Sequence, residues 1–389
     1  MSGITKIVQL GCGITGLVCA EELAKNAKVA ELVLADSRTD AAEAMASRVK
    51  SDKVSVKKVD ATNPKDLKGL LKDADIVVNS LPWHLLRNVL DTAAALGVNY
   101  VDFSLTVDKM EQLEMVSKMC KDKGITAITA MGADPGISDS FAAYAAKKLD
   151  EPEEAHVMDG DCGSAEGFDF FSLWSPVDML EETTVPAAVF RNGKIEYIPP
   201  LNEREEYEFP APIGRLPVYK TNHEETYLMP MFIKGLKKAD FRIAIDDNFA
   251  SMSKMIRRLG LHSLQPIEVD GCKVKPLNVV ASVFPKTTDL AGKVKGYAGV
   301  VVEVIGKKNG KRTMVKVYTT MSHEEAYKKC RSNATGYLVG VGGALGTELL
   351  INGDVKGPGM FVPEQLPVEK IISRLPSKGL EVKEEIRTL

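Results

Sequence analysis

The first third of the chain alternates short apolar runs with longer segments of helical periodicity. Runs rich in Val, Ile and Leu, such as KIVQL (6–10), ELVLAD (31–36) and ADIVVNSLP (74–82), are each followed by a segment whose apolar residues recur three and four positions apart. Strands that alternate with helices are typical of a parallel sheet covered by helices on both faces. The pattern therefore predicts six β-α repeats over residues 1–132, which form a doubly wound α/β domain of the Rossmann type.

The pattern changes beyond residue 132. Polar loops become longer, a proline-rich segment spans 198–217, and two alternating runs flank Asn309-Gly310. Both residues of that pair tolerate positive φ, which is a strong hairpin signal. These features predict a second α+β domain with a mainly antiparallel sheet over residues 133–335. An apolar helix rich in small residues follows, and we expect residues 336–389 to return to the first domain.

Composition and charge narrow the class of partner. The 389 residues are 44% hydrophobic and 26% charged, and the net charge of −3 is spread over interleaved acids and bases. The chain thus has no basic field for nucleic acid and no polybasic patch for a membrane, which favours a small-molecule partner. The six cysteines form no ligand-like cluster, and neither a signal peptide nor an apolar run long enough to span a bilayer is evident. We expect a cytoplasmic protein without a bound metal.

A glycine-rich turn carries the first chemical signal. Gly11, Gly13 and Gly16 follow the first predicted strand and open the first predicted helix, and Asp36 ends the second strand about 20 residues beyond Gly16. In a dinucleotide site the glycines allow a tight turn, close approach of the pyrophosphate and close packing of helix on strand. The alternative is a glycine turn without a ligand. The residues predicted to form the turn are Gly11, Cys12, Gly13, Ile14, Thr15 and Gly16.

Asp36 favours NAD, because its charge would repel the 2′-phosphate of NADP, although Ser37 and Arg38 could accommodate that phosphate. The carboxyl ends of parallel strands line the ligand crevice, so turns after later strands are further candidates. Alternatively, these turns are ordinary starts of helices without a ligand, and Asp60 or Asp134 caps the helix that follows. The predicted cofactor contacts from these turns are Asp60, Ala61, Asn79, Ser80, Leu81, Pro82, Ser104, Asp134, Pro135 and Gly136.

Several of these short sequence motifs occur in an order that resembles the saccharopine dehydrogenase family. They are the glycine turn, VVNSLP (77–82), YVDFS (100–104) and GADPGISD (132–139). FSLWSPVDML (171–180), VYKTNHEETYLM (218–229) and GPGMFVPEQL (357–366) extend the resemblance over nearly the whole chain. The family includes saccharopine reductases, lysine 6-dehydrogenases and carboxynorspermidine dehydrogenases.

The resemblance implies an enzyme that transfers hydride between NAD(P) and the CH–NH carbon of a lysine-type amino acid, saccharopine or L-lysine. It also implies a homodimer formed through the second domain's sheet. One alternative is a carboxynorspermidine dehydrogenase-like polyamine enzyme, because the NHEE stretch resembles that type. Another, of a different class, is an NAD-binding sensor or assembly protein without catalysis.

Acid-base and substrate residues follow from the same stretches. His223 with Glu224 is the leading acid-base pair, and Asp102, expected beside the nicotinamide, is the rival. Each candidate also has an alternative without function: the arginines as surface residues, the histidine as an exposed loop residue and the aromatic residues as core packing. The predicted substrate contacts are Arg215, Arg331, Trp174, Phe171, Thr221 and the tyrosine beside Val218, Tyr219.

Overall fold

The computed structural model describes residues 5–107, 109–286 and 289–389. Its contacts divide the chain into two compact units. The first unit contains Met1–Tyr144 and Gly336–Val382, and the second contains Ala145–Thr335 and Lys383–Leu389. The chain therefore leaves the first unit 12 residues later than the expected end at 132, near the end of a helix. The expected range 336–389 is shared between the two units.

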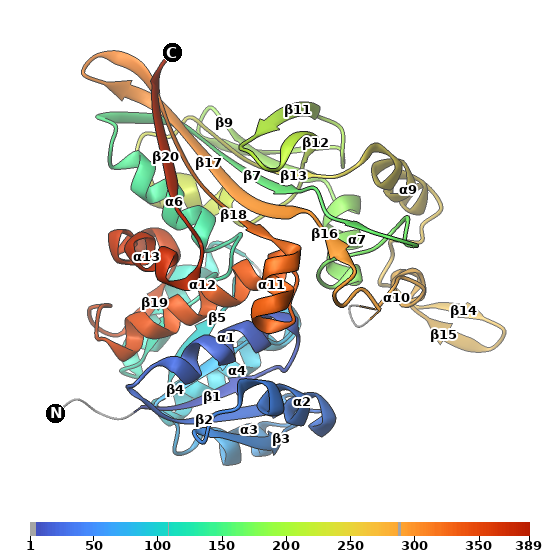
Figure 1. Ribbon diagram of the computed structural model, residues 1–389, viewed down its shortest axis with the longest axis vertical. Helices are drawn as coiled ribbons and strands as arrows, with labels where there is room; N and C mark the ends of the chain where they lie inside the picture. The colour runs from blue at the N-terminus through green and yellow to red at the C-terminus, as the bar shows by residue number, and fades with distance from the viewer. Residues whose placement is uncertain (1–4, 108, 287–288) are drawn as a thin grey trace. The chain divides into compact units, whose positions relative to one another are not determined.

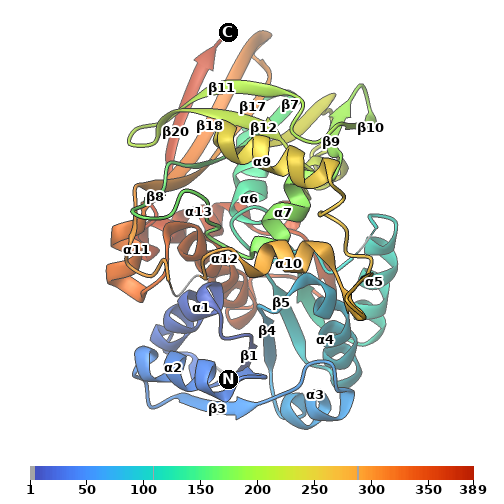
Figure 2. The same cartoon turned by 90° about the vertical axis from the view of Figure 1, so that its right-hand side faces the viewer.

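The first unit is built on a parallel sheet of seven strands in the order β19-β6-β5-β4-β1-β2-β3, which confirms the predicted doubly wound fold. Helices α1 and α2 lie on one side of this sheet and α3, α4 and α5 on the other (Figure 2). The strands are β1 (Thr5–Leu10), β2 (Val29–Asp36), β3 (Val54–Lys58), β4 (Ile76–Asn79), β5 (Asn99–Asp102), β6 (Thr126–Ile128) and β19 (Gly359–Phe361). The helices that cluster wholly or mostly with this unit are α1 (Ile14–Lys25), α2 (Thr39–Val49), α3 (Pro64–Leu71), α4 (Trp83–Leu96), α5 (Gln112–Asp122), α6 (Ile137–Ala146), α12 (Ala334–Ile351) and α13 (Val368–Arg374), with 3₁₀ turns at Pro363–Gln365 and Leu375–Lys378.

Helix α12 packs closely on the first unit through a row of glycines. A Cβ added to Gly342 would lie 2.0 Å from the carbonyl oxygen of Gly132, and one on Gly343 would lie 1.9 Å from the ring of Phe103. A Cβ on Gly340 would lie 2.5 Å from the carbonyl oxygen of Thr15 in α1. Small residues are therefore required here because the backbones approach within the space of one side-chain atom.

The length and hydropathy of α12 differ from the expectation that no segment could span a bilayer. Ala334–Ile351 has 18 residues and a mean hydropathy of 1.3, so by length and composition alone it is apolar enough to cross a membrane. In the structure 78% of this window is buried. A largely buried core helix of a globular protein has the same composition.

The second unit is built on a nine-stranded mixed sheet, coloured mainly green to orange in Figure 1. Only the β13–β7 pairing is parallel among the described strand pairs of this sheet, so it is mainly antiparallel as predicted. The strands are β7 (Glu151–Asp161), β9 (Ala187–Arg191), β10 (Lys194–Ile198), β11 (Arg204–Phe209), β12 (Gly214–Lys220), β13 (Lys238–Ala244), β17 (Tyr297–Lys308), β18 (Lys311–Ser322) and β20 (Lys383–Thr388). Two smaller pairs are β8 (Ser164–Ala165) with β16 (Val294–Lys295), and β14 (Ile267–Val269) with β15 (Cys272–Val274). The helices are α7 (Pro176–Thr184), α8 (Glu225–Phe232), α9 (Asp247–Arg258), α10 (Pro276–Ser282) and α11 (His323–Cys330).

The predicted hairpin at Asn309-Gly310 is present. Lys308 of β17 pairs with Lys311 of β18, and the two residues between them have φ of 51° and 74°. Positive φ at both positions is what a two-residue turn between twisted strands requires.

Two short strands near the C-terminus were not predicted. β19 pairs in parallel with β6 at the edge of the first sheet, and β20 pairs antiparallel with β18 of the second sheet. Both pairings join segments that lie far apart in the sequence. Three residues, as in β19, carry no readable periodicity, so only the edge they meet defines them.

The glycine contacts of α12 predict opposite effects for two Gly→Ala substitutions. Gly342→Ala places a Cβ against the Gly132 carbonyl and should lower the free energy of unfolding by about 2 kcal/mol or more. Gly69→Ala in α3 is the control, because a Cβ there meets no atom within 4 Å and removal of glycine should raise stability by about 0.5–1 kcal/mol. Denaturant titration of both variants tests the packing, and equal effects would contradict it.

Candidate active site

The glycine turn of the first unit is shaped by three different constraints. Gly11 has φ of +91°, and a Cβ on it would lie 2.7 Å from the backbone oxygen of Ser80. A Cβ on Gly16 would lie 2.5 Å from the Gly11 oxygen, whereas Gly13 has no atom within 4 Å of its Cβ position. Gly11 and Gly16 are thus needed for packing, and Gly13 leaves open space where α1 begins. Ile14 and Thr15 follow in the first turn of α1, which contains no acidic side chain.

This arrangement fits a dinucleotide pyrophosphate. The first N–H groups of a helix have no intrahelical acceptor, and the helix dipole favours an anion near them. Open space beside Gly13, a close-packed turn and the absence of a carboxylate in the first turn leave those groups available. The residues of the turn would hold the pyrophosphate by main-chain contacts.

Asp36 lies beside this turn at the end of β2. One of its carboxylate oxygens accepts a hydrogen bond of 2.8 Å from the Cys12 N–H, and the other accepts one of 2.9 Å from the Arg38 N–H. Burial, followed by the charge of Asp36, raises the pKa of the Cys12 thiol to about 12, so this thiol is neutral. Ser37 and Arg38 are exposed. Lys58 is paired with Asp36 across β2 and β3 and is also exposed, a neighbour that the sequence pattern did not single out.

The turn after β4 mainly supports the glycine turn. The Ser80 hydroxyl donates to the carbonyls of Leu10 (2.8 Å) and Gly11 (3.0 Å), so it fixes the backbone. Asn79 is buried, donates to the Tyr100 hydroxyl at 3.1 Å and accepts from the Leu81 N–H at 3.3 Å. The exposed Pro82 leads into α4.

The other predicted cofactor turns have well-defined local structures. Asp60 is exposed and accepts from the N–H and hydroxyl of Thr62, which lowers the pKa of its carboxyl; Asn63 caps α3 instead of Asp60. The carbonyl of Ala61 accepts from Asn88 at 2.6 Å, and that of Ser104 accepts from the Thr129 hydroxyl at 3.1 Å.

The turn before α6 is tighter than predicted. α6 begins at Ile137, so Pro135 precedes the helix and is not part of its first turn. Gly136 has φ of +134°, and a Cβ on it would lie 2.3 Å from the Gly132 oxygen. Asp139, not Asp134, accepts from the Gly136 N–H, at 2.8 Å. The close approach predicted for Gly136 is therefore to the protein's own backbone.

Asp102 is fully buried at the end of β5. Its oxygens accept hydrogen bonds from Tyr100 (2.7 Å), Thr129 (2.9 Å), the Ala130 N–H (3.0 Å) and Thr106. Burial raises the pKa of its carboxyl to about 7, although the hydrogen bonds oppose that shift. A carboxylate with every direction occupied and no exposed surface is suited to joining β5, β6 and their loops. This geometry is unfavourable for a base that must reach a substrate.

His223 lies in the second unit, just before α8, and is surrounded by carboxylates. Its Nδ1 is hydrogen-bonded to Glu225 and lies 3.4 Å from Glu224. The ring stacks on Phe241 of β13 with centroids 3.9 Å apart and an interplanar angle of 14°. Burial alone would lower the pKa of His223, but Glu225, Glu224 and Glu182 raise it well above the ordinary value. His223 is therefore an imidazolium at neutral pH. Among the described residues, its Nε2 has no hydrogen-bond partner.

Glu182 is the member of this cluster that the sequence did not reveal. It lies in α7, and one of its oxygens accepts from the hydroxyl of Thr221 at 2.7 Å. Burial raises the pKa of its carboxyl, and His223 partly opposes that shift. Neither Glu182 nor Glu224 forms an ion pair with lysine or arginine within the described residues. Glu225 directly follows the predicted pair and could have been included; Glu182 lies too far away in the sequence.

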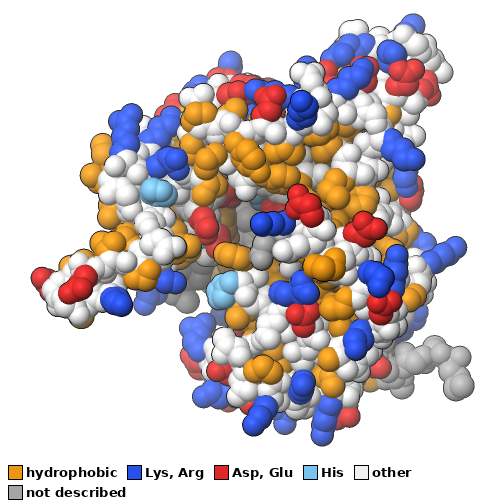
Figure 3. Space-filling model, turned by 180° about the vertical axis from the view of Figure 1, so that it is seen from behind, with side chains coloured by type: hydrophobic (Ala, Val, Ile, Leu, Met, Phe, Trp, Pro, Cys, Tyr) orange, Lys and Arg blue, Asp and Glu red, His pale blue; other side chains and the backbone are white. Residues whose placement is uncertain are grey.

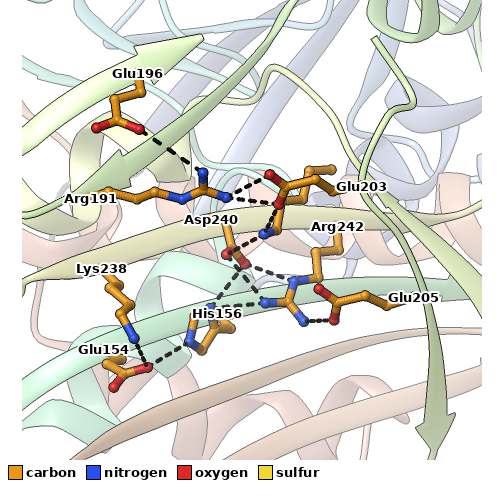
Figure 4. A network of polar contacts seen from close by, with 10 residues as sticks. Glu154, His156, Arg191, Glu196, Glu203, Glu205, Lys238, Asp240 and Arg242 are labelled. Carbon is orange, nitrogen blue, oxygen red and sulfur yellow. Dashed lines mark hydrogen bonds and ion pairs between the residues drawn. The ribbon is translucent and has the colours of Figure 1, made fainter. Parts of the chain in front are cut away.

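A second histidine of the same unit lies in a cluster whose carboxylates are neutralised by lysine and arginine (Figure 4). His156 contacts Asp240 through Nδ1 at 2.9 Å and Glu154 through Nε2 at 3.6 Å, so both ring nitrogens are engaged. Burial lowers its pKa, but Asp240 and Glu154 together raise it to about 9. Arg242 and Lys220 also contact Asp240. Since protein cations balance the acids here, this network is structural.

The two predicted arginines are exposed and lie on different elements. Arg215 on β12 has 69% of its side chain exposed and lies 3.6 Å from Glu206. Arg331 ends α11 in the left-handed conformation and stacks over the Tyr327 ring at 4.9 Å. Neither has a contact with the His223 cluster among the described residues. Their role as carboxylate clamps stays a prediction.

The predicted aromatic substrate contacts pack against, or hydrogen-bond to, other residues of the second unit, and their role in substrate binding stays a prediction. Phe171 and Trp174 are partly buried against a small apolar cluster around Leu173 and Leu290. Tyr219 donates its hydroxyl to Asp247 at 2.6 Å. Of these substrate candidates only Thr221 reaches the His223 cluster, through Glu182.

The same cluster has a donor set of the kind that binds metal ions. One ligand atom from each of His223, Glu224 and Glu225 lies within 4.8 Å of the others. Activity after treatment with a chelator tests the expectation that the protein binds no metal.

Burial of Asp102 predicts a pH-dependent stability. The pKa of the Asp102 carboxyl is higher in the folded state than in the unfolded state. Its protonated form therefore stabilises the fold fully below the pKa of the unfolded state, and this stabilisation is lost as pH rises through about 7. Between about pH 4 and 7 the loss should reach up to about 4 kcal/mol. Asp102→Asn should remove this dependence, because an amide oxygen can accept from Ala130 while the hydroxyls reorient. Denaturant unfolding at several pH values measures it; a variant that folds but loses all activity would instead favour the catalytic role.

Comparisons with known proteins agree with these observations. Residues 7–128 match the saccharopine dehydrogenase NADP binding domain, and residues 132–380 match the saccharopine dehydrogenase C-terminal domain. The fold is similar to apo saccharopine dehydrogenase (L-Glu forming) from Saccharomyces cerevisiae, with a TM-score of 0.76 at 18% identity over 99% of this chain and 100% of that one.

Two relatives align over nearly their full length. The chain is 31% identical to the carboxynorspermidine synthase of Vibrio cholerae, over 96% of this chain and 95% of that protein. It is 27% identical to the carboxyaminopropylagmatine dehydrogenase of Synechocystis sp., over 97% and 96%. The resemblance seen in the sequence is confirmed, and the chain is an oxidoreductase with an NAD(P)-binding domain that belongs to the saccharopine dehydrogenase family.

Proposed function

We propose that this protein reduces the imine between an aldehyde and a primary amine that carries a second cationic group, so that the product is a carboxyaminopropyl amine. This is the polyamine alternative of the sequence analysis, and it shares the CH–NH chemistry of the saccharopine and lysine enzymes. The observation that carries the proposal is the excess of carboxylates around His223.

The charge of the cluster selects a cationic substrate. One imidazolium is surrounded by Glu182, Glu224 and Glu225. Buried or half-buried charges are retained where they are paired. An ammonium or guanidinium would supply the positive charge that no lysine or arginine gives to Glu182 or Glu224 among the described residues. A second substrate carboxylate, as in saccharopine, would be repelled.

The relatives support the same substrate class. The relatives from Vibrio cholerae and Synechocystis sp. carry names that describe carboxynorspermidine and carboxyaminopropylagmatine, whereas the alpha-aminoadipic semialdehyde synthase of Mus musculus matches 50% of this chain. A carboxyaminopropyl group has the carbon skeleton of aspartate semialdehyde, which we propose as the aldehyde.

His223 can supply the proton that imine formation requires. The amine adds to the aldehyde to give a carbinolamine, and loss of water needs a proton on the departing hydroxyl. Because Nδ1 is fixed on Glu225, Nε2–H is the donor that remains. The nicotinamide cofactor supplies the hydride that reduces the C=N carbon. Glu224 and Glu182 hold the imidazolium in its charged form.

Between the two cofactors we propose NADP, although Asp36 alone favours NAD. Ser37, Arg38 and Lys58 are exposed around the end of β2. The Asp36 carboxylate accepts from two main-chain N–H groups and, at 3.4 Å, from the Ser37 hydroxyl. Two cations and a hydroxyl are suited to a 2′-phosphate. We also propose a homodimer.

A substrate panel tests the function. Oxidation of the reduced cofactor should require both aspartate semialdehyde and an amine such as 1,3-diaminopropane, putrescine or agmatine. Lysine with 2-oxoglutarate and saccharopine in the reverse direction serve as the competing substrates. Turnover of saccharopine in preference to every diamine would overturn the proposal, and cofactor binding without any turnover would favour the non-catalytic alternative.

Two variants test the role of His223 within the same assay. His223→Gln should lower kcat by about a hundredfold. Glu224→Gln removes a carboxylate that raises the pKa of His223, so the loss of activity at high pH should move to lower pH. If the pH profile of activity is unchanged in Glu224→Gln, His223 is not the acid. Activity lost on chelation and restored by a divalent metal would favour a metal site instead.

Arg38→Ala tests the cofactor proposal. A lost hydrogen-bonded ion pair to phosphate is worth about 1.5–3 kcal/mol, so kcat/KM for NADPH should fall roughly tenfold or more while that for NADH changes little. Arg48→Ala, also an exposed arginine of the first unit, is the control. Equal losses with both cofactors for Arg38→Ala would refute the assignment.

A further inference from the structure

Three metal-ligating side chains meet where α8 begins, and we call them the His-Glu-Glu group. One ligand atom from each of His223, Glu224 and Glu225 lies within 4.8 Å of the other two. Among the side chains that the structure describes, this is the only group of three or more histidine, cysteine, aspartate or glutamate residues close enough to hold a metal ion. One imidazole nitrogen with two carboxylate oxygens suits zinc, whereas magnesium and calcium prefer oxygen ligands alone.

The spacing of these atoms is close to that of ligands around zinc. Zinc binds nitrogen and oxygen ligands at about 2.0–2.2 Å in a tetrahedral arrangement, so two of its ligands lie roughly 3.3–3.5 Å apart. Nδ1 of His223 lies 3.4 Å from a carboxylate oxygen of Glu224. The contact between Nδ1 and Glu225 is closer because a shared proton lies in it. A metal ion that takes the place of this proton moves the two atoms apart, which rotation of the carboxylate allows.

The imidazole ring is already held in one orientation. It stacks on Phe241 with centroids 3.9 Å apart and an interplanar angle of 14°, which fixes the plane in which Nδ1 points. The side chain of Glu224 is 31% exposed, whereas that of Glu225 is fully buried. An ion can therefore reach the group from solvent by way of Glu224, and Glu225 offers it a ligand shielded from water.

The charge of the group matches that of a divalent cation. A metal ion that binds Nδ1 displaces the proton from that nitrogen. Zinc then brings two positive charges, as many as the proton of His223 and one substrate ammonium bring together. Glu182 adds a third carboxylate that interacts with His223, which strengthens the attraction for a dication. Zinc can thus replace both the proton and the amine.

Other zinc ligands in the chain are less suited. Both ring nitrogens of His156 contact carboxylates, and Arg242 and Lys220 in the same network repel a cation. Of the six cysteines only Cys272 is exposed. Histidine side chains, pale blue in Figure 3, make up little of the face shown there. Zinc that binds tightly should therefore bind at the His-Glu-Glu group.

We propose that the His-Glu-Glu group is a zinc site, and that a zinc ion bound there inhibits the enzyme by occupying the place of the substrate amine. The ion is an inhibitor and not a cofactor, because it blocks the histidine that supplies the proton. Binding of zinc rests on the geometry of the group alone, whereas competition with the amine rests on the proposed function.

Equilibrium dialysis of the full chain against Zn²⁺, without substrate or cofactor, tests the site directly. The wild type should bind one zinc ion per chain. Glu224→Gln removes a charged ligand and keeps its shape, so it should raise the dissociation constant roughly tenfold or more. Glu181→Gln is the matched control, since Glu181 is a partly buried glutamate of α7 outside the group. Cys272→Ser, the second control, removes the exposed thiol. Both controls should bind zinc like the wild type, and circular dichroism shows whether each variant is folded.

Cobalt(II) in place of zinc reports which atoms bind the metal. A site of one nitrogen and carboxylate oxygens should give visible d–d absorption without the near-ultraviolet charge-transfer band of a cobalt–thiolate bond. Equal zinc affinity in the wild type and in folded Glu224→Gln would overturn the zinc site. So would a thiolate band in the cobalt spectrum, or the absence of zinc binding to the wild type.

Initial rates with the reduced cofactor test the inhibition. Free zinc is held constant with a metal buffer, because diamines also bind zinc. Zinc should raise the KM for the amine without lowering kcat, and a chelator should restore the rate. Inhibition that added amine does not relieve would overturn the competition. If no diamine is a substrate, the proposed function fails, and the dialysis experiment still decides whether the zinc site exists.

Discussion

The cofactor site depends on one constraint: the glycine-containing turns of the first unit pack backbone against backbone. Gly11 packs against Ser80, Gly16 against Gly11, and Gly136 and Gly342 both pack against Gly132, each within the space of a single Cβ atom. Interiors packed at this density have no room to absorb an added carbon. Because the turns are held by contacts with one another, the open space at Gly13 is part of a rigid framework. Preorganisation of this kind lets main-chain N–H groups bind an anion without rearrangement.

The polar residues at the turns of the first unit divide into those that hold the turns together and those that are exposed. Ser80 and Asp102 use their polar atoms on the protein's own backbone and hydroxyls. Arg38 and Lys58 are exposed. A buried group that is fully hydrogen-bonded stabilises the turn, and a ligand that drew it away would leave its partners unsatisfied. Exposed cations bear no such cost, which is why we propose Arg38 and Lys58 for recognition of the adenosine half.

Local signals in the sequence were sufficient for much of this structure. The alternation of strand and helix, the glycine spacing and the Asn309-Gly310 turn each act within a few residues, and the structure confirms the fold that they predict. β19 and β20 exist only because distant edges accept them. Glu182 reaches His223 because α7 and the segment before α8 pack together in three dimensions. Spacing along the chain cannot reveal such a contact. A motif that resembles the family, such as NHEE, can identify only one of the two segments that form it.

The two histidine clusters of the second unit show how charge balance distinguishes structure from function. Around His156 the acids Asp240 and Glu203 meet Arg242, Lys220 and Arg191, so the protein itself neutralises the network. Around His223, Glu182 and Glu224 meet no lysine or arginine within the described residues. One imidazolium cannot neutralise three carboxylates, and excess negative charge away from water destabilises the fold unless a ligand balances it. This imbalance is why we propose that a substrate amine brings the remaining positive charge.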